Sequence, residues 1–501
     1  MKKKLSLILA LMMLLPACAP ESDDVSQDTT GVTTADTAIA AVTQTTAPAI
    51  PADKLPDTLN FDGETFCAYT RVKYFFHGEM FIDESNGEML NDARFDARTA
   101  VESRLNVSFE EEYYGDLGNY SDNDAPRNLL LSGDTTYDIY NGRHAHMFTY
   151  AAQGLAHKLT EVPYLDLTAH WWDEEFSNDI TLGKEKYFAF GAYNLTTYDS
   201  IHMLLFNKKL FTDLNIEEMR LGGQTIYDVV KAGNWTYDLM NEVMTDVSAD
   251  MDGDGVMTKA DRWAYVTPAK QVLPSFLIGG GFYMVQKDEN NFLYNSMEGN
   301  EGFYDAFIDI MDMMWTNSTW FPTPASMTDE EELEIYDMFK NGQGLFCDST
   351  GGNVIRYREM DIDFGIIPYP KSSDSQEYYC SRSEYPELFV IPLVNDTLDC
   401  TGAVLEALSS EYYRSVIPAY FEQSLKGRTV RDEESSEMLE LIYAHRVFDF
   451  GDTVLCSEIR DGKMRELMAE NNRDFSSMLT SISPIVKKRM NTLNKGFGLG
   501  S

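Results

Sequence analysis

Short apolar and polar blocks alternate along the chain from residue 58 onward, and they predict strands and helices in turn. The segment 58–69 is typical of an opening strand, residues 92–105 have helical spacing, and residues 106–110 alternate between apolar and polar side chains. Other short apolar runs that we interpret as strands cover residues 137–140, 187–191, 201–206, 344–347, 364–368 and 388–392. Helices are predicted at 234–244, 302–315 and 329–340, and over most of the chain after Thr401. This order of elements predicts an α/β fold.

The start of the chain has the pattern of a secretory signal. Three lysines follow Met1, the apolar run from Leu5 to Leu15 is too short to cross a bilayer, and the small residue Ala17 precedes Cys18. A cysteine at this place resembles a bacterial lipoprotein signal, in which the cysteine carries the lipid. We therefore expect residues 1–17 to be a signal peptide and Cys18 to anchor the protein to the outer face of the bacterial cytoplasmic membrane. An ordinary export signal with an incidental cysteine is the alternative, and it leaves the next segment unexplained.

That next segment, residues 18–57, is built from Thr, Ala, Ser, Asp and Pro, and the first aromatic residue of the chain is Phe61. A segment with so little apolar surface cannot offset the entropy lost on ordering. We interpret residues 18–57 as a disordered tether between the membrane and the folded part of the protein.

The remaining length of about 445 residues exceeds what one hydrophobic core usually accommodates, so two lobes are expected. The chain has 81 Asp and Glu against 40 Lys and Arg, and the signal removes three lysines, so the mature net charge is 37 − 81 = −44. Such a charge disfavours nucleic acid and anionic lipid as partners. It also disfavours a polyanionic ligand, unless a few arginines outweigh it locally. The six cysteines have no regular spacing and do not indicate a disulfide scaffold.

The segment 250–261 has the spacing of a calcium-binding loop. Aspartates occupy positions 1, 3, 5 and 12 of these twelve residues, and Gly255 at position 6 permits a tight turn. Calcium prefers six to eight hard oxygen ligands, so we expect a structural Ca²⁺ bound by the residues Asp250, Asp252, Asp254, Val256 and Asp261, with Val256 contributing its carbonyl. Asp261 is one methylene shorter than the usual Glu at position 12, so weaker binding is expected. The alternatives are an acidic surface turn that binds nothing and, less favoured, a calcium switch.

Four sequence segments, in a fixed order, resemble those of the extracellular solute-binding proteins of family 1, the lipoproteins that deliver solutes to ABC importers. They are residues 167–172 with 182–188, then 206–211, 233–236 and 338–346. The resemblance implies a periplasmic-binding-protein-like fold of two α/β lobes, a hinge and an interlobe ligand cleft. It places lobe one at 58–200 plus 350–410, and lobe two at 201–349 plus 411–501. Some members of this family carry a calcium loop after the same tryptophan-led helix.

Ligands of open α/β sheets bind beyond the carboxyl ends of the strands. Together with the resemblance, this rule predicts that the cleft is lined by the residues Arg143, His144, Tyr193, Asn194, Phe276, Asp348, Ser349 and Arg382. Arg, Asp and Asn suit the adjacent hydroxyls of sugars, and aromatic faces suit their C–H surfaces. Trp171 and Trp172 could form a sugar platform, but we expect them to pack in the core.

The resemblance predicts a monomeric substrate-binding lipoprotein, not an enzyme, that captures a sugar or oligosaccharide and passes it to the permease subunits of an ABC transporter. The main alternatives are a secreted glycoside hydrolase, a receptor for a peptide or another polar solute, and an adhesion protein. The sequence contains no G-x-S-x-G, H-E-x-x-H or Rossmann glycine motif. Paired carboxylates are too common among 81 acidic residues to support a hydrolase.

Overall fold

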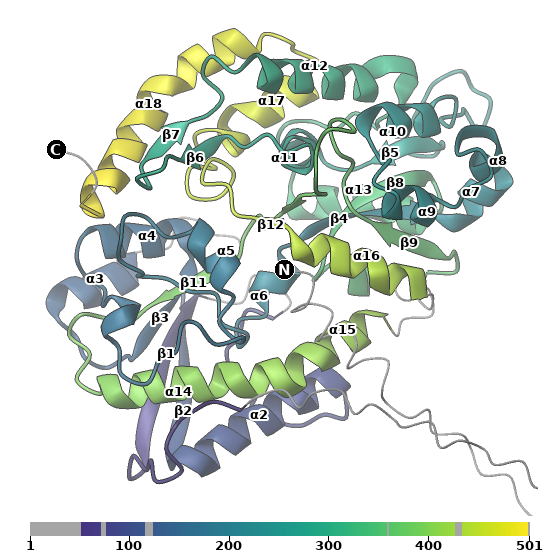
Figure 1. The fold of residues 1–501 in the computed structure, drawn as a ribbon. Coiled ribbons are helices and arrows are strands. Elements are labelled where there is room, and N and C mark those ends of the chain that lie inside the picture. The colour runs from purple at the N-terminus through teal and green to yellow at the C-terminus, as the bar shows by residue number, and fades with distance from the viewer. Residues whose placement is uncertain (1–51, 72–76, 116–123, 358–359, 426–432, 499–501) are drawn as a thin grey trace, which may run out of the picture.

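The computed structural model describes residues 52–71, 77–115, 124–357, 360–425 and 433–498. They form a two-lobed α/β fold in which each lobe is built on a four-stranded sheet (Figure 1). The expected signal peptide, Cys18 and the tether up to residue 51 lie outside the described residues. Among the described helices, none is long and apolar enough to span a membrane.

The first lobe is built on β1 (Glu64–Arg71), β2 (Val107–Tyr114), β3 (Ile139–Arg143) and β11 (Glu387–Val390), in the order β11-β3-β1-β2. β1, β2 and β3 are parallel, and β11 runs antiparallel to β3. Two long helices, α2 (Met89–Leu105) and α14 (Leu398–Glu411), pack against each other, and α14 contacts β1. Figure 1 shows them side by side, crossing the lower part of β1 and β2.

The second lobe is built on β4 (His202–Asn207), β5 (Trp263–Val266), β8 (Gly344–Thr350) and β9 (Phe364–Ile367), in the order β5-β8-β4-β9. β4 runs antiparallel to both of its neighbours, while β5 and β8 are parallel. α13 (Asp329–Lys340) packs on β5 and β8, and α16 (Glu433–Ala444) packs on β9. Two small two-stranded sheets pair β6 (Val285–Lys287) with β7 (Leu293–Asn295), and β10 (Ser381–Arg382) with β12 (Arg446–Val447).

The remaining helices connect or cover these sheets. Those before β5 are α3 (Asp124–Ser132), α4 (His144–Ala152), α5 (Glu174–Asp179), α6 (Thr196–Asp199), α7 (Lys208–Asp213), α8 (Ile216–Arg220), α9 (Ile226–Lys231) and α10 (Tyr237–Met244). Those after β5 are α11 (Ala269–Gly279), α12 (Glu301–Trp315), α15 (Ile417–Leu425), α17 (Arg465–Ala469) and α18 (Phe475–Gly496). Short 3-10 or π turns occupy η1 (Leu159–Glu161), η2 (Thr316–Ser318), η3 (Val354–Tyr357), η4 (Tyr412–Val416) and η5 (Arg460–Met464).

Side-chain caps explain where several helices begin. In α13 the hydroxyl of Thr328 accepts the N–H of Glu331, and the Glu331 carboxylate accepts the N–H of Thr328 in return. This capping box satisfies two N–H groups that a helix end leaves without partners. α12 begins in the same way after Asn300, whose side chain accepts the N–H of Phe303.

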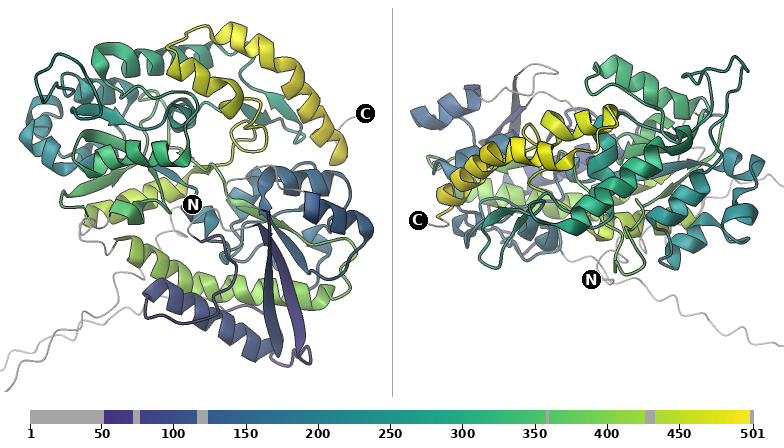
Figure 2. Two further views of the ribbon diagram at one scale, coloured as in Figure 1. Left: turned by 180° about the vertical axis from the view of Figure 1, so that it is seen from behind. Right: turned by 90° about the horizontal axis from the view of Figure 1, so that it is seen from above.

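α18 contacts parts of both lobes. It packs on β7, where the Asn494 side chain exchanges two hydrogen bonds with the backbone of Leu293 (3.0 and 3.2 Å), and its C-terminal end packs on α4. The views from behind and from above show this helix on the outside of the molecule, reaching from one lobe toward the other (Figure 2).

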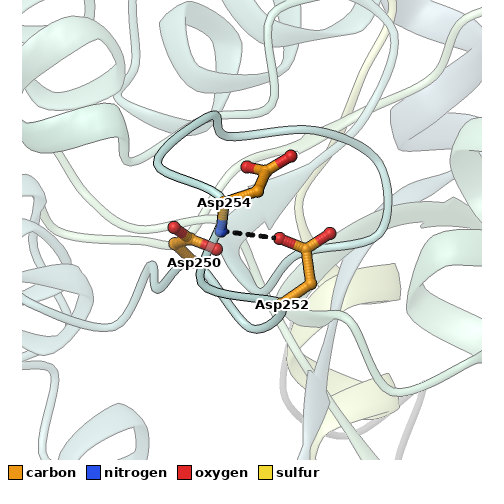
Figure 3. A group of neighbouring side chains, drawn as sticks. All are labelled: Asp250, Asp252 and Asp254. Carbon is orange, nitrogen blue, oxygen red and sulfur yellow. Dashed lines mark hydrogen bonds between the residues drawn. The ribbon is translucent and has the colours of Figure 1, made fainter.

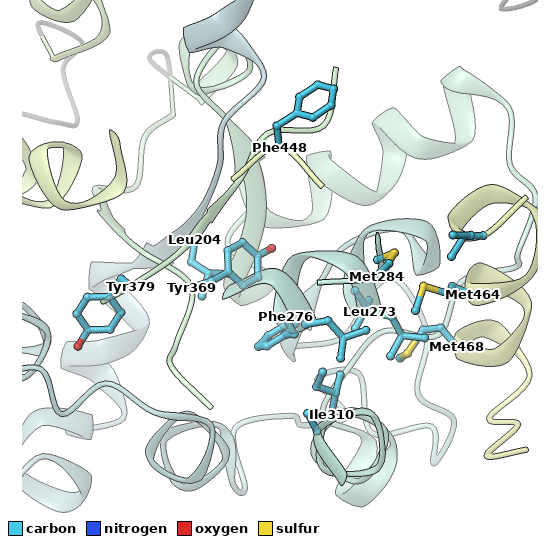
Figure 4. Packing of buried hydrophobic residues seen from close by; sticks show 14 of the residues in the cluster. Leu204, Leu273, Phe276, Met284, Ile310, Tyr369, Tyr379, Phe448, Met464 and Met468 are labelled. Atoms are coloured by element: carbon cyan, nitrogen blue, oxygen red, sulfur yellow. The ribbon is translucent and has the colours of Figure 1, made fainter. Parts of the chain in front are cut away.

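Large aromatic and aliphatic side chains fill the interior of the second lobe (Figure 4). Phe276 of α11 makes edge contacts with the rings of Tyr237, Tyr265 and Tyr369. Trp171 and Trp172 are buried in the first lobe, and the Trp172 Nε1 donates to Glu406 of α14 at 2.7 Å. The expectation that this tryptophan pair packs in the core is confirmed.

The structure corrects three sequence expectations. The run 187–191 is not a strand, because Phe190 bonds to α5 and the residue before it instead: its N–H donates to the Ser177 hydroxyl, and its carbonyl oxygen accepts the N–H of Asp173. The folded part begins before residue 58, since Arg104 binds Asp53 through two hydrogen bonds of 2.7 Å and Leu55 is buried. β9 lies within the segment 350–410 assigned to lobe one, yet it pairs with β4 in the second sheet.

The cysteines Cys67, Cys347, Cys380, Cys400 and Cys456 are all free in the structure. They are buried or half-buried, and burial raises the pKa of the Cys67 thiol to about 11 and that of Cys400 to about 12. These side chains therefore act as small packed groups.

Candidate ligand-binding cleft

A cleft of about 990 Å³ lies between the two lobes. The first lobe contributes the ends of β1 and β3, and the second lobe contributes the start of β4, the end of β8 and the starts of α11 and α13. Residues 384–387 and the segment 456–465 complete its wall. Both sheets therefore present strand ends to one shared space, the arrangement in which ligands bind in open α/β sheets.

Strand pairing explains which ends face the cleft. Arg143 at the end of β3 pairs with Glu387 at the start of β11, because β11 is antiparallel. In the second sheet, Thr350 at the end of β8 pairs with His202 at the start of β4 for the same reason. Each lobe thus offers the last residue of one strand and the first residue of its antiparallel neighbour.

Of the eight predicted cleft residues, Arg143 and His144 line the cleft. The Arg143 Nη2 donates to the Cys456 sulfur at 3.0 Å. Burial, with the nearby Arg143 guanidinium, lowers the pKa of His144 to about 3, so its imidazole is neutral at physiological pH. Its Nδ1 lies 3.3 Å from the Pro386 carbonyl oxygen.

The other six do not line the cleft: Tyr193, Asn194, Phe276, Asp348, Ser349 and Arg382. The prediction is wrong for them because each is buried in packing or hydrogen bonds of the fold itself. Tyr193 packs on Trp172 and Phe389, and the Asn194 amide donates to the Glu387 carbonyl oxygen at 2.7 Å. Phe276 belongs to the core of the second lobe (Figure 4).

Asp348 and Ser349 miss the cleft because β8 is longer than expected. The apolar run ends at Cys347, but the strand continues to Thr350, so both polar residues lie inside the sheet. The Asp348 carboxylate accepts from the His202 Nδ1 at 2.9 Å and from the Tyr369 hydroxyl. Asp348 therefore does not face the cleft, but it holds His202, a residue of the cleft wall, in position.

A buried charge network connects the cleft to the strands that join the lobes. The His202 Nε2 lies 2.9 Å from a Glu384 oxygen, and Arg460 contacts the other Glu384 oxygen at 2.7 Å. Arg382 binds both oxygens of Asp452 at 2.6 and 2.9 Å. Burial disfavours charge on these groups, but each charge faces an opposite one.

The network keeps its members ionised. Burial opposes protonation of His202, yet the facing carboxylates of Asp348 and Glu384 outweigh it and raise the pKa of the imidazole. Burial likewise opposes ionisation of Glu384, yet the guanidinium groups of Arg382 and Arg460 lower its pKa well below the usual value. At this point the cleft wall is polar and charged, and its positive and negative groups neutralise one another.

Sequence reasoning missed His202, Glu384 and Glu387, which all line the cleft. His202 and Glu387 are the first residues of their strands, whereas the strand-end rule points to the last residues of strands. The run Arg382-Ser383-Glu384-Tyr385-Pro386-Glu387 before an apolar strand was the available signal. Whether these residues reach the cleft depends on the direction of the strand that follows them. The local sequence does not determine that direction.

The acidic loop 250–261 lies apart from this cleft. Carboxylate oxygens of Asp250, Asp252 and Asp254 lie within 4.8 Å of one another on the exposed loop (Figure 3). The Asp261 carboxylate is buried and accepts the N–H groups of Met251 (2.8 Å) and Thr258 (2.6 Å). α10 ends at Met244 and β5 begins at Trp263, so the loop joins a helix to a strand.

No protein-family model matches the chain, and no curated protein matches its sequence. Solved structures do match. A cyclo/maltodextrin-binding protein complexed with maltotetraose superposes with a TM-score of 0.56 and 12% identity over 85% of this chain and 97% of that one. M. tuberculosis UspC gives a TM-score of 0.53 and 12% identity over 86% and 100%.

The maltose-maltodextrin binding protein of the thermoacidophilic bacterium Alicyclobacillus acidocaldarius gives a TM-score of 0.52 and 13% identity, over 84% of this chain and 100% of that one. At such identity the likeness establishes architecture, and it extends over nearly the whole of each of these structures. The chain therefore has the two-lobed α/β fold of these proteins, with a ligand-sized cleft between its lobes.

Proposed function

We propose that this protein is the substrate-binding lipoprotein of an ABC importer, which captures a sugar or oligosaccharide and delivers it unchanged to membrane permease subunits. The observation that carries the proposal is the cleft of about 990 Å³ that both lobes line with hydrogen-bonding side chains. Its volume is at the upper end of the range for small-molecule sites, roughly 300–1,000 Å³. The maltodextrin-binding proteins with the same fold support the saccharide assignment.

Ligand capture in such a fold works by hinge bending. A ligand that contacts both lobes binds the closed form more tightly than the open form, and this difference in affinity shifts the population toward closure. The importer then distinguishes the closed, loaded protein from the open one. No chemical step is required of the protein, so we propose that it is not an enzyme.

A thermal-shift screen of the mature protein against mono- to trisaccharides and short peptides tests this function. We expect at least one saccharide to raise the melting temperature, because a ligand that binds only the folded state adds RT ln(1 + [L]/Kd) to its stability. The variant Arg143→Ala should lose that shift, while Arg473→Ala, on an exposed pair with Asp312, should keep it. Stabilisation by peptides alone would identify a peptide receptor, and turnover of an oligosaccharide would identify a hydrolase.

We further propose that the loop 250–261 binds a structural Ca²⁺ through Asp250, Asp252, Asp254, the Val256 carbonyl and Asp261. The three clustered carboxylates and the positive φ angles of Gly253 and Gly255 support this assignment. When bound, the ion would neutralise acidic groups that otherwise repel one another. The protein supplies oxygen ligands of the kind that Ca²⁺ prefers.

A chelator titration checks the calcium proposal. Removing Ca²⁺ should lower the melting temperature of the wild type, with a loss of about 2.7 kcal/mol if the ion was present at about 100 times its Kd. The double variant Asp252→Asn/Asp254→Asn should show no chelator effect. Asp305→Asn, an exposed acid on α12, serves as the control and should respond like the wild type. An unchanged wild-type melting temperature in chelator would overturn the assignment.

We also propose that Cys18 carries a lipid that holds the protein, as a monomer, on the outer face of the cytoplasmic membrane. The basic, apolar and small residues before Cys18 support this location. Metabolic labelling with a fatty acid should mark the wild type, and Cys18→Ser should abolish both the label and membrane retention. A labelled Cys18→Ser variant would contradict it.

A further inference from the structure

Charged residues are distributed differently in the cleft than over the whole chain. The chain has about two acidic residues for each basic one, 81 against 40. Among the described residues, the cleft is instead lined by six basic residues (Arg71, Arg143, Lys270, Arg356, Arg460, Arg465) and six acidic ones (Asp199, Asp329, Glu332, Glu384, Glu387, Asp461). Basic side chains are therefore enriched at this site relative to the rest of the protein.

Most of the acidic residues in the cleft are already engaged. Glu332 pairs with Lys270 at 2.6 Å, and Arg460 contacts both Glu384 and Asp461 at 2.7 Å. The Asp199 carboxylate faces His77 and accepts from the Tyr420 hydroxyl at 2.9 Å. These contacts leave the acids little capacity to neutralise further arginines.

Glu387 adds little negative charge at neutral pH. Burial raises the pKa of its carboxyl to about 8, although the Arg71 guanidinium works in the opposite direction. The protonated form therefore predominates at pH 7.

Two arginines of the cleft, Arg356 and Arg465, have no carboxylate partner in the part of the chain that the structure describes. Across the described residues, neither Arg356 nor Arg465 makes an ion pair, although the chain has twice as many acids as bases. The Nε of Arg465 is buried and has no hydrogen-bond partner within the described part of the chain. Arg356 and Arg465 therefore bring to the cleft lining two guanidinium groups that the described acids do not neutralise, and such groups can donate to an acidic ligand.

Aromatic side chains are few among the described residues that line the cleft. Beside two histidines, this part of the lining has Tyr336 and Tyr385, although 12% of the chain is aromatic. A neutral sugar presents C–H faces that aromatic rings cover, whereas the planar fork of arginine matches a carboxylate or sulfate. The lining therefore favours charge-assisted hydrogen bonds to an acidic group.

We propose that the ligand is an anionic saccharide, carrying a carboxylate or a sulfate, whose acidic group is bound by cleft arginines that include Arg356 and Arg465. This inference rests on the proposed function, since it assumes that the cleft takes a sugar. The net charge of the chain repels anions at long range, but screening limits that repulsion to about 8–10 Å at physiological salt. Inside the cleft, the local arginines dominate.

Matched sugar pairs test the inference by calorimetry on the mature protein. Each pair differs only at C6, as in galactose and galacturonate or glucose and glucuronate, and is used as mono-, di- and trisaccharide, with a 6-sulfated member added. We expect an acidic member to bind at least tenfold more tightly than its neutral partner. Tighter binding of the carboxylated or of the sulfated member identifies which acid the arginines recognise.

Point variants identify which arginines of the cleft cause the preference for acidic over neutral sugars. Arg356→Gln and Arg465→Gln should each reduce the acidic-over-neutral ratio at least fivefold, and Arg465→Lys should retain part of it because it keeps the charge. Arg473→Gln, at the surface, should leave the ratio unchanged. Equal or tighter binding of the neutral sugars overturns this inference while the proposed function stands. Binding of no member of any pair overturns the inference, and the proposed function falls with it only if the thermal-shift screen also finds no saccharide that binds.

Discussion

Asp348 is a buried carboxylate that links the cleft wall of the second lobe to the core of that lobe. It contacts His202, which lines the cleft, and Tyr369, which packs in the core. Removing one partner of a buried, hydrogen-bonded charge pair leaves the other charge uncompensated. We expect Asp348→Ala to lower the free energy of unfolding by about 3–5 kcal/mol, measured by denaturant titration.

Asp213→Ala is the matched control for that variant. Asp213 forms an exposed i, i+4 pair with Lys209 on α7, and such pairs contribute about 0.3–0.5 kcal/mol. A loss for Asp348→Ala no larger than for Asp213→Ala would show that the buried network is not a source of stability.

Glu387 makes stability depend on pH. Its folded-state pKa is raised from 4.5 to about 8 because the carboxyl is buried, so the folded protein holds a proton that the unfolded chain releases. This contribution to stability is fully present below pH 4.5 and is lost as the pH rises through 8. Relative to Glu387→Gln, the wild type should lose on the order of 4 kcal/mol of unfolding free energy between pH 5 and pH 9.

The measurement compares urea unfolding of the two proteins at several pH values. Glu110→Gln, at an exposed position on β2, should follow the wild-type curve. Parallel curves for the wild type and Glu387→Gln would mean that Glu387 ionises normally in the fold.

Close packing of helices against the first lobe can be tested at Gly402 of α14. A Cβ added there would lie 1.9 Å from the Pro163 carbonyl oxygen, which belongs to the backbone and cannot move aside easily. Gly402→Ala should therefore cost about 1–3 kcal/mol or more by overpacking. Gly302→Ala on α12 should instead gain up to about 1 kcal/mol, because its nearest neighbour is 3.4 Å away and alanine favours helix. Thermal unfolding that moves both variants in the same direction would contradict this reading of the packing.

Elements with local signals were predictable from the sequence. The helix expected at 329–340 has these bounds in the structure, because the Thr328–Glu331 capping box lies within the segment itself. The run 187–191 lacked such a signal and its apolar residues fill a core without joining a sheet. β8 continues to Thr350 because β4 pairs with it from Phe346 to Thr350, which is a long-range contact.

The candidate site was harder to predict than the fold for the same reason. Arg143 and His144 follow from β3, whose parallel neighbour β1 precedes it in the chain. His202 and Glu387 reach the cleft only because β4 and β11 run antiparallel to their partners. Arg460 and Arg465 come from a segment more than 100 residues beyond β8 and line the cleft through tertiary folding alone.

At the scale of the whole molecule, the two lobes share a charged cleft, a buried network and an external helix. The network members Arg382 and Glu384 lie on the strand segment that leads from the second sheet to the first. In the proposed function, hinge bending moves the lobes while these charges stay paired. Contacts far from the hinge, by contrast, can form in one state and break in the other.

Phe497, at the end of α18, makes a contact of this kind, between the lobes and outside the cleft. Its ring lies 5.9 Å from Phe148 of α4 and 5.5 Å from Tyr187, both in the first lobe, while Asn494 holds the same helix to β7 of the second. Phe497 does not line the cleft. We expect Phe497→Ala to weaken saccharide binding by about threefold to tenfold through loss of closed-state stability, since an aromatic pair contributes about 0.5–1.5 kcal/mol.

Small-angle scattering distinguishes this effect from a local one. In the absence of sugar, Phe497→Ala should have a larger radius of gyration than the wild type, and saturating sugar should remove most of the difference. Ile485→Ala, at an exposed position on the same helix, should match the wild type in both affinity and size. If Phe497→Ala binds sugar with wild-type affinity and unchanged size, α18 moves with the first lobe in both states and its contact with α4 does not report closure.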